Sequence, residues 1–161
     1  MPSFRRLVRG FRAILGLSRP DDAWARERLR PNEYALFAKL DPRDREHSVL
    51  VAQELLRRHP EAPEAAVRAA LLHDVGKAVR PYRAIERILT ALLEPWLPDL
   101  PEEPRLPGWR GAVQVRLHHE RYAADLVSDP SVRALILAMK NEAEPEIRKW
   151  ARRIAEVDDL F

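Results

Sequence analysis

Cysteine is absent from this chain of 161 residues, and that absence excludes several chemistries at once. The protein has no disulfide framework, no thiol nucleophile and no cysteine-based zinc or iron–sulfur site. The length fits one domain, and a chain of this size can bury a hydrophobic core without disulfide bonds or a structural metal. Apolar residues at 46% and charged residues at 33% fit a globular protein and not a disordered one.

Long apolar runs and strand-like alternation are also missing from the sequence. No apolar run approaches the ~18 residues of a membrane-spanning helix. The first 17 residues do not read as a standard signal peptide, because arginines interrupt their apolar stretch. We therefore expect a cytoplasmic protein. Apolar residues recur almost everywhere at the 3.6-residue period of a helix, which predicts an all-α fold.

Acidic residues are missing from positions 1–20, which carry five arginines and a charge of +5. The other 141 residues hold 23 basic and 25 acidic side chains, so the basic character belongs to the N-terminal segment alone. Because nucleic-acid-binding proteins spread a basic stripe over the fold, a nucleic-acid partner is not expected. The segment predicts a basic amphipathic helix that packs on the domain or docks on a membrane surface or a partner. Its apolar residues at helical spacing are Phe4, Leu7, Val8, Phe11, Ile14 and Leu15.

The remaining residues, 21–161, are predicted to form one helical bundle of about six to eight helices. Five prolines fall three residues apart between Pro95 and Pro107, which excludes an α-helix there. Residues 95–108 are therefore expected to form a surface excursion, with a docking motif or a lid as the alternative. The expected helices cover residues 22–40, 44–58, 63–77, 82–94, 109–127, 130–140 and 145–160.

Histidines and acids mark the candidate site. His73 and Asp74 directly follow an apolar helical run, where a carboxylate is costly unless it is paired or bound to a cation. His47 shares a helix face with Val51 and Leu55 and is expected to point to the core. Read singly, the first pair could be a salt-bridged helix end and His47 a satisfied core histidine.

The last predicted helix carries an acid on its apolar stripe. Asp158 lies four residues after Ile154 and three before Phe161, whereas Asp159 leaves that face. An uncompensated carboxylate there would be costly or would take up a proton. His47, His73, Asp74 and Asp158 together make a mixed nitrogen–oxygen set that suits one octahedral divalent metal, Mn, Fe, Co, Ni or Mg, with two positions open.

In order and spacing these residues resemble the H…HD…D pattern of the HD-domain metal-dependent phosphohydrolases. The local matches are Arg45 to Ala52 and the signature Leu71 to Lys77, and the resemblance covers about residues 33–161. It implies an all-α bundle in which His47, His73, Asp74 and Asp158 hold the metal. It also implies that water attacks the phosphorus of a phosphomonoester or phosphodiester, with a small phosphate ester or nucleotide as the substrate.

The resemblance also implies roles for the neighbouring polar residues. Asp74 is placed to orient the attacking water as a base, and Lys77 to reach a phosphate oxygen. The alternative for Lys77 is a cation that closes a helix end. The segment His118-His119-Glu120 resembles the family's third histidine, which binds a second metal in binuclear members. The further histidine expected about 20 residues later is missing, which favours one metal.

His118 or His119 is then expected to contact phosphate or act as a general acid. A helical surface with one half-buried histidine is the alternative reading of that pair. Arg45, within a turn of His47, could also meet phosphate or simply belong to a solvated helix start. Trp96, Trp109 and Trp150 are expected to be core or loop anchors.

Three functions follow from this reading. The first is a metal-dependent phosphohydrolase in which Asp74, Lys77 and His119 are catalytic and Lys77, His118, His119 and Arg45 bind substrate. The second is a catalytically weak HD-type module that binds a nucleotide or metal in signalling. The third is a purely structural helical protein, which requires the four proposed metal ligands to be dispersed in space.

Overall fold

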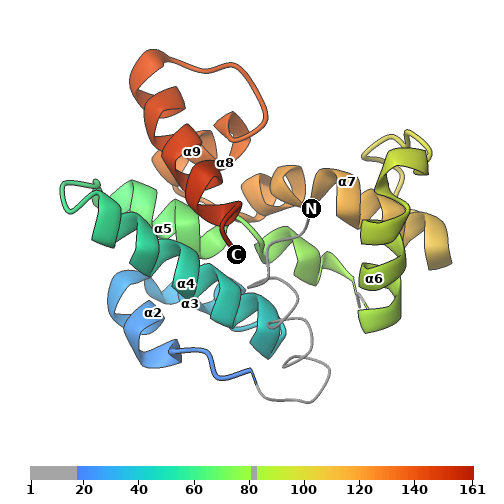
Figure 1. The fold of residues 1–161 in the computed structure, drawn as a ribbon, viewed down its shortest axis with the longest axis horizontal. Coiled ribbons are helices and arrows are strands. Elements are labelled where there is room, and N and C mark those ends of the chain that lie inside the picture. The colour runs from blue at the N-terminus through green and yellow to red at the C-terminus, as the bar shows by residue number, and fades with distance from the viewer. Residues whose placement is uncertain (1–17, 81–82) are drawn as a thin grey trace.

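The computed structural model describes residues 18–80 and 83–161, and within these ranges all regular structure is helical (Figure 1). This confirms the predicted all-α class. Residues 1–17 of the predicted N-terminal helix lie outside the described residues. The elements are α2 (Asp22–Arg28), α3 (Pro31–Phe37), α4 (Pro42–Arg58), α5 (Glu64–Leu72), α6 (Ala84–Leu92), α7 (Gly108–Leu126), α8 (Pro130–Ala138) and α9 (Pro145–Asp158), with 3₁₀ turns η1 (Val75–Val79) and η2 (Glu94–Trp96).

Proline and aspartate fix where several helices begin. The side chain of Asp41 accepts a hydrogen bond from the amide of Asp44 at the start of α4, and Asp129 caps α8 in the same way. The single helix predicted over 22–40 is wrong. Leu29 is extended, and Pro31 opens a new helix, because proline fits the first helical position but not a helix interior.

The core forms around α5, whose residues 66–72 are all buried. Helices α4 and α8 pack on α5, and α9 packs on both α8 and α4 (Figure 1). This arrangement brings the beginning of α4, the end of α5 and the end of α9 to one place. None of the helices in the described ranges combines the length and apolar character needed to cross a membrane.

The helix predicted over 63–77 is shorter in the structure, because α5 stops at Leu72 and the chain turns through His73 and Asp74 into η1. η1 packs directly against α7. Gly76 makes this possible, since a Cβ there would lie 1.9 Å from the carbonyl oxygen of His119. The glycine is therefore required by close packing of two backbones and not by the end of a helix.

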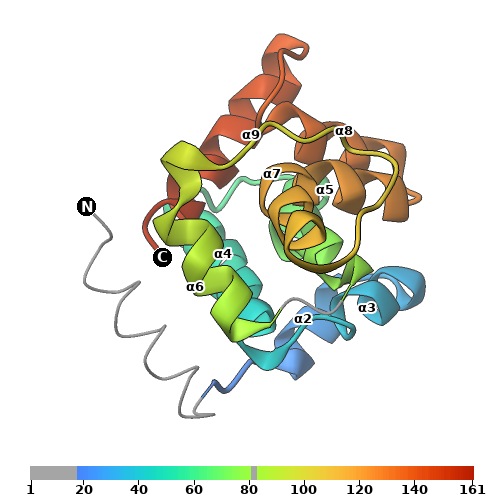
Figure 2. The ribbon, with the colours of Figure 1, turned by 90° about the vertical axis from the view of Figure 1, so that its right-hand side faces the viewer.

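The proline-rich segment after α6 loops round to the start of α7 and lies along that helix (Figure 2). Only its first residues are helical, in the short turn η2, which the sequence did not predict. The amide group of Gln114 donates to the carbonyls of Pro101 and Pro104, and its oxygen accepts from the amide of Leu106. Tyr122 donates to the carbonyl of Glu102. The segment is thus a surface excursion fastened by side chains of α7.

Candidate metal centre

His47 enters the site from the second turn of α4. Its side chain is almost fully buried and shares the inner face of the helix with Val51 and Leu55, which are completely buried. The Nε2 atom of His47 lies 3.8 Å from Oδ2 of Asp74. The sequence prediction that this histidine points to the core is therefore confirmed.

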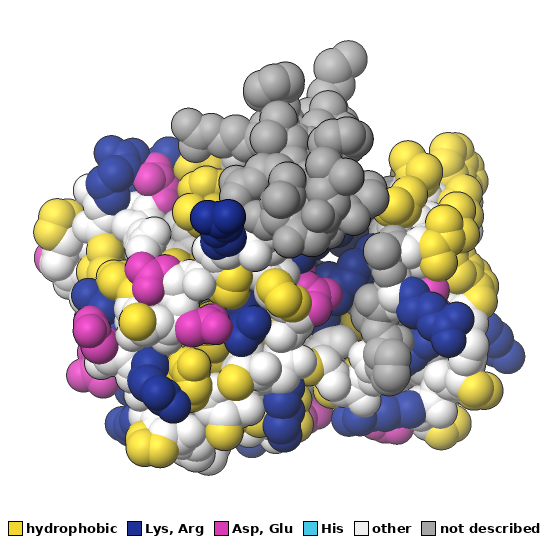
Figure 3. Space-filling view, turned by 90° about the horizontal axis from the view of Figure 1, so that it is seen from below, with side chains coloured by type: hydrophobic (Ala, Val, Ile, Leu, Met, Phe, Trp, Pro, Cys, Tyr) yellow, Lys and Arg dark blue, Asp and Glu magenta, His cyan; other side chains and the backbone are white. Residues whose placement is uncertain are grey.

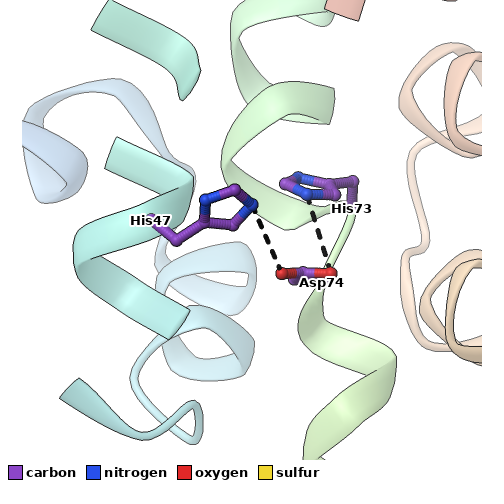
Figure 4. A group of neighbouring side chains, drawn as sticks. All are labelled: His47, His73 and Asp74. Carbon is purple, nitrogen blue, oxygen red and sulfur yellow. Dashed lines mark ion pairs between the residues drawn. The ribbon is translucent and has the colours of Figure 1, made fainter. Parts of the chain in front are cut away.

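His73 and Asp74 meet His47 because the chain leaves α5 at this point. His73 keeps helical torsion angles and Asp74 has φ −94° and ψ −4°, so two consecutive side chains project into the same space (Figure 4). Nε2 of His73 lies 3.6 Å from Oδ1 of Asp74, and both residues are buried. Candidate ligand atoms of His47, His73 and Asp74 all lie within 4.8 Å of one another.

Asp158 approaches from the last turn of α9. Its Oδ1 accepts a hydrogen bond of 2.6 Å from Nε2 of His47 and lies 3.6 Å from Nε2 of His73. Its side chain is 31% exposed, whereas Asp74 is 1% exposed, so the cluster opens to solvent on the α9 side. The four residues are brought together from three helices, which excludes the dispersed arrangement required by a purely structural protein.

The state of His73 fits a metal ligand. Its Nδ1 lies 2.8 Å from the carbonyl oxygen of Ala70 and donates to it, so Nε2 is the nitrogen left for a metal. The other nitrogen, Nε2, is buried and has no hydrogen-bond partner in the structure. Two carboxylates face this nitrogen, and either a proton or a metal cation on it would balance their charge. Ligands about 2.1 Å from a metal lie about 3 Å or more apart, which matches the two 3.6 Å separations of His73, whereas the 2.6 Å hydrogen bond between His47 and Asp158 would have to lengthen for both to bind one ion.

Lys77 contacts the cluster through Asp74. Its Nζ donates to Oδ2 of Asp74 at 2.6 Å. Burial disfavours the charged lysine, but Asp74 and Asp44 outweigh that effect and raise the pKa of Lys77. Burial likewise favours neutral Asp74, but Lys77 and the neighbouring histidines outweigh it and lower the pKa of Asp74. The pair is therefore ionised at neutral pH.

The other site groups are held in definite charge states. Burial is the largest influence on His47 and lowers its pKa despite the hydrogen bond to Asp158. For His73 burial also acts downward, but Asp74 and Asp158 raise the pKa to about 9. Burial opposes ionisation of Asp158, yet His47 and His73 lower its pKa. The proton on His73 thus offsets the charge of the two carboxylates, and a dication bound by the cluster would replace it.

His119 reaches Asp74 from α7. Its Nε2 lies 3.4 Å from Oδ1 of Asp74 and 3.3 Å from Oε1 of Glu120, and its Nδ1 lies 3.1 Å from the carbonyl oxygen of Val115. Burial, followed by the charge of Lys77, lowers the pKa of His119 to about 4. His119 is therefore neutral at pH 7, with its acceptor nitrogen towards Asp74. This state favours a ligand or an acceptor over the general acid considered from the sequence.

Two of the predicted substrate-binding residues lie outside this cluster. Arg45 pairs with Asp22 of α2 through NH1 at 2.9 Å. Nε2 of His118 lies 2.6 Å from the carbonyl oxygen of Leu100, so this side chain holds the proline-rich segment on α7. Their phosphate-binding roles remain predictions that no direct contact with the cluster supports.

Sequence reasoning missed a buried ion pair beside the site. Asp44 lies one turn before His47 on α4 and accepts bonds of 2.7 and 2.6 Å from NH1 of Arg87 on α6. Its spacing of three residues from His47 was the available signal, because such residues share a helix face. The partner on α6 could not be read from any local pattern.

Comparison with known proteins agrees with this geometry. A search of curated proteins and a search of solved structures each gave no match. The family model described as the HD domain matches residues 45–160, which is more than half of the chain and includes all four clustered residues. Proteins of this family generally bind divalent metals and act as metal-dependent hydrolases, although some are not catalytic. The chain belongs to the HD-domain family.

Proposed function

We propose that the protein is a phosphohydrolase that holds one divalent metal with His47, His73, Asp74 and Asp158. The observation that carries the proposal is the buried Nε2 of His73, which has no hydrogen-bond partner and faces the carboxylates of Asp74 and Asp158 at 3.6 Å. A divalent metal at this place would supply an acidified water and would polarise the phosphoryl group of a phosphate ester. Mn, Fe, Co, Ni and Mg all suit the nitrogen–oxygen donor set.

The chain's own residues would then divide the remaining work. Asp74 has two oxygens, and the one near His73 and His119 suits the metal while the other faces Lys77. Asp74 would orient the attacking water and accept its proton. Lys77 would stabilise negative charge on a phosphate oxygen, because its ammonium is buried, charged and fixed in place.

His119 completes the arrangement as an acceptor. Its neutral Nε2 beside Asp74 would accept a proton or hydrogen bond from water in the site. Lys140 binds Glu120 at 2.8 Å, and Glu120 in turn adjoins His119. Lys140 thus pairs with the carboxylate that could otherwise join His119 as a ligand of a second metal, which supports a mononuclear centre.

The substrate is proposed to be a phosphomonoester or phosphodiester of a nucleotide or a similar small molecule. The test is hydrolysis of p-nitrophenyl phosphate, its bis ester, and nucleoside mono-, di- and cyclic phosphates with Mn²⁺ or Co²⁺. Asp74→Ala is expected to lower kcat about 10³-fold or more. Asp125→Ala removes an exposed acid of α7 that pairs only with surface arginines in the described contacts, and it should leave activity unchanged.

A second candidate is a binding module of weak catalytic power. The 2.6 Å ion pair between Lys77 and Asp74 favours it, because this bond occupies the carboxylate oxygen that a water-orienting base needs. Stoichiometric Mn²⁺ binding and tight nucleotide binding without phosphate release across the substrate set would establish this alternative. Asp74→Ala with undiminished turnover would contradict the assigned roles outright.

A further inference from the structure

Helix α6 turns polar side chains toward the protein and apolar side chains toward solvent. Thr90 is fully buried and donates to the carbonyl of Glu86. By contrast, Ile85 is 58% exposed and Leu92 is 67% exposed. An ordinary surface helix has the opposite orientation, with its apolar stripe on the core. The outward stripe of α6 is therefore a candidate for contact with another molecule.

Ion pairs hold α6 in this orientation. Arg87 binds Asp44 through NH1 and Asp41 through NH2, the latter at 2.7 Å, and so ties α6 to the first turns of α4. Glu86, also on the polar face, accepts a bond of 3.0 Å from Arg80. Because its polar face is bound to neighbouring elements, α6 presents the apolar stripe as a fixed feature of the surface.

The stripe continues from α6 into η2, since the amide of Leu93 still donates to the carbonyl of Leu89. It forms a ridge of apolar side chains at the right-hand end of the molecule in Figure 3, the end where Figure 1 places α6. Trp96, expected from the sequence to be a core or loop anchor, is instead 76% exposed. We call this surface the α6 apolar face, and its residues are Ile85, Ile88, Leu89, Leu92, Leu93 and Trp96.

The α6 apolar face is symmetric about its own middle. Its six positions form three pairs, and the two members of each pair are equally far along the chain from the point between residues 90 and 91. When two copies of α6 lie antiparallel about a two-fold axis at that point, each apolar residue therefore meets another apolar residue. The pairs across the axis are Ile85 with Trp96, Ile88 with Leu93, and Leu89 with Leu92. A two-fold interface between identical chains requires this self-complementarity.

The charges at the two ends of the face have opposite signs. Arg83 is exposed at the beginning of α6, and Arg110 is exposed in the first turn of α7, which Arg80 joins to α6. Towards the other end, Glu94 belongs to η2 and Asp99 is exposed just after it. An antiparallel pair brings the basic end of one copy to the acidic end of the other. The dipoles of the two helices then also oppose each other favourably.

These charges favour a second copy as the occupant. A bilayer with anionic lipids would attract the basic end of the face but repel its acidic end. Six apolar side chains with these exposures present roughly 600 Å² in each copy, so a pair would bury about 1,200 Å², which reaches the lower range of specific interfaces. The net charge of +3 adds only weak repulsion between two copies.

We propose that the α6 apolar face binds the same face of a second copy of this chain in an antiparallel, two-fold arrangement. Leu89 and Leu92 of both copies form the centre, and Trp96 of each copy covers Ile85 of the other. Arg83 of each copy lies beside Asp99 of the other and fixes the register. Because the buried area is modest, the dimer dissociates on dilution.

The test is sedimentation equilibrium of the full chain at about 0.1 M salt, with protein between about 1 and 100 μM. The wild-type chain should dimerise with a dissociation constant of about 10 μM or lower. Leu92→Glu should raise this constant about tenfold or more, because it places a carboxylate in the apolar centre of each copy. Leu126→Glu is the matched control, because Leu126 is 40% exposed at the far end of α7, outside the face.

Charge reversal tests the antiparallel register. Arg83→Asp alone and Asp99→Arg alone each place like charges together twice in the symmetric dimer, so each should raise the dissociation constant about threefold or more. The chain that carries both changes restores opposite charges and should return to within about twofold of wild type. A double reversal that associates no better than either single reversal contradicts the arrangement.

The other contrary results also overturn the proposal. A wild-type chain that stays monomeric at every concentration contradicts it, as does a Leu92→Glu chain that dimerises as well as wild type. Monomeric wild type that cosediments with vesicles of phosphatidylglycerol shows that a bilayer covers the face instead. Monomeric wild type with a higher melting temperature than Leu92→Glu, but not higher than Leu126→Glu, shows that another part of the same chain covers it. None of these measurements depends on phosphohydrolase activity.

Discussion

Replacing Gly76 with alanine is expected to lower the free energy of unfolding by about 3 kcal/mol. The added Cβ would lie 1.9 Å from the carbonyl oxygen of His119 and 2.7 Å from the amide nitrogen of Ala123. A carbon and a carbonyl oxygen normally approach no closer than about 3.3 Å, so η1 must move from α7 by more than about 1 Å. Both contacts are helix backbone, and no side-chain rotation relieves them.

The displacement would also separate candidate site residues. Asp74 and Lys77 lie at the beginning and middle of the η1 region, whereas His119 lies on α7, so the 3.4 Å approach of His119 to Asp74 is lost. Urea unfolding followed by circular dichroism gives the stability loss, and Mn²⁺ titration gives the change at the site. We expect weaker Mn²⁺ binding in addition to lower stability.

Gly108→Ala separates the steric cause from an intrinsic effect of losing glycine. Gly108 has φ +56° and open space around a Cβ, so alanine there meets conformational strain of about 1 kcal/mol and no clash. It should leave Mn²⁺ binding unchanged. The reasoning about close packing would be refuted if Gly76→Ala lowered the free energy of unfolding by less than Gly108→Ala does and retained wild-type Mn²⁺ affinity.

Three further predictions concern buried charge. Arg68→Leu should cost about 3–5 kcal/mol in urea unfolding, because Glu33 is 1% exposed and loses the cation at 2.8 Å, and the double variant with Glu33→Leu should recover most of that loss. Burial acts to raise the pKa of Asp129, but the amides of α8 and the Arg68 guanidinium outweigh it and hold that pKa below its usual value. The stability that the ionised carboxylate contributes is therefore present above about pH 4 and should fall as the pH drops through the lowered pKa. Asp129→Asn should flatten this part of the pH–stability curve. Lys77→Met should lower the melting temperature in EDTA, because Asp74 loses its partner at 2.6 Å. Added Mn²⁺ should restore most of the lost melting temperature, since a bound cation stabilises the folded state. No recovery with Mn²⁺ would argue against a cation site at Asp74.

The sequence predicted the helical class and the family correctly, because apolar periodicity and the order and spacing of His47, His73, Asp74 and Asp158 can be read directly along the chain. Helix breaks were less accessible. The turn at His73 depends on how η1 packs on α7, and a helical pattern can run through such a turn without interruption. Pro31 fits a helix start, and it divides residues 22–40 into the two helices α2 and α3.

The orientation of α6 shows a different limit. Periodicity identified a helix with one apolar face, but it does not say which face the protein buries. That choice depends on Arg80, Asp41 and Asp44, which lie on other elements and bind the polar face of α6. In the candidate site, the proton positions on His73 and His119 likewise depend on backbone carbonyls that only the folded chain brings near. The roles assigned there stay predictions until metal binding and turnover are measured.

Asp158 occupies an electrostatically awkward place on α9. It is the last residue of the helix, where the peptide dipoles sum to a partial negative charge, so an ionised carboxylate there is repelled by its own helix. A cation held by Asp158 is attracted by both the carboxylate and the helix end. Metal binding should therefore reduce local unfolding of the final turn of α9. Amide hydrogen exchange there should slow on addition of Mn²⁺, while exchange at the exposed start of the helix stays unchanged.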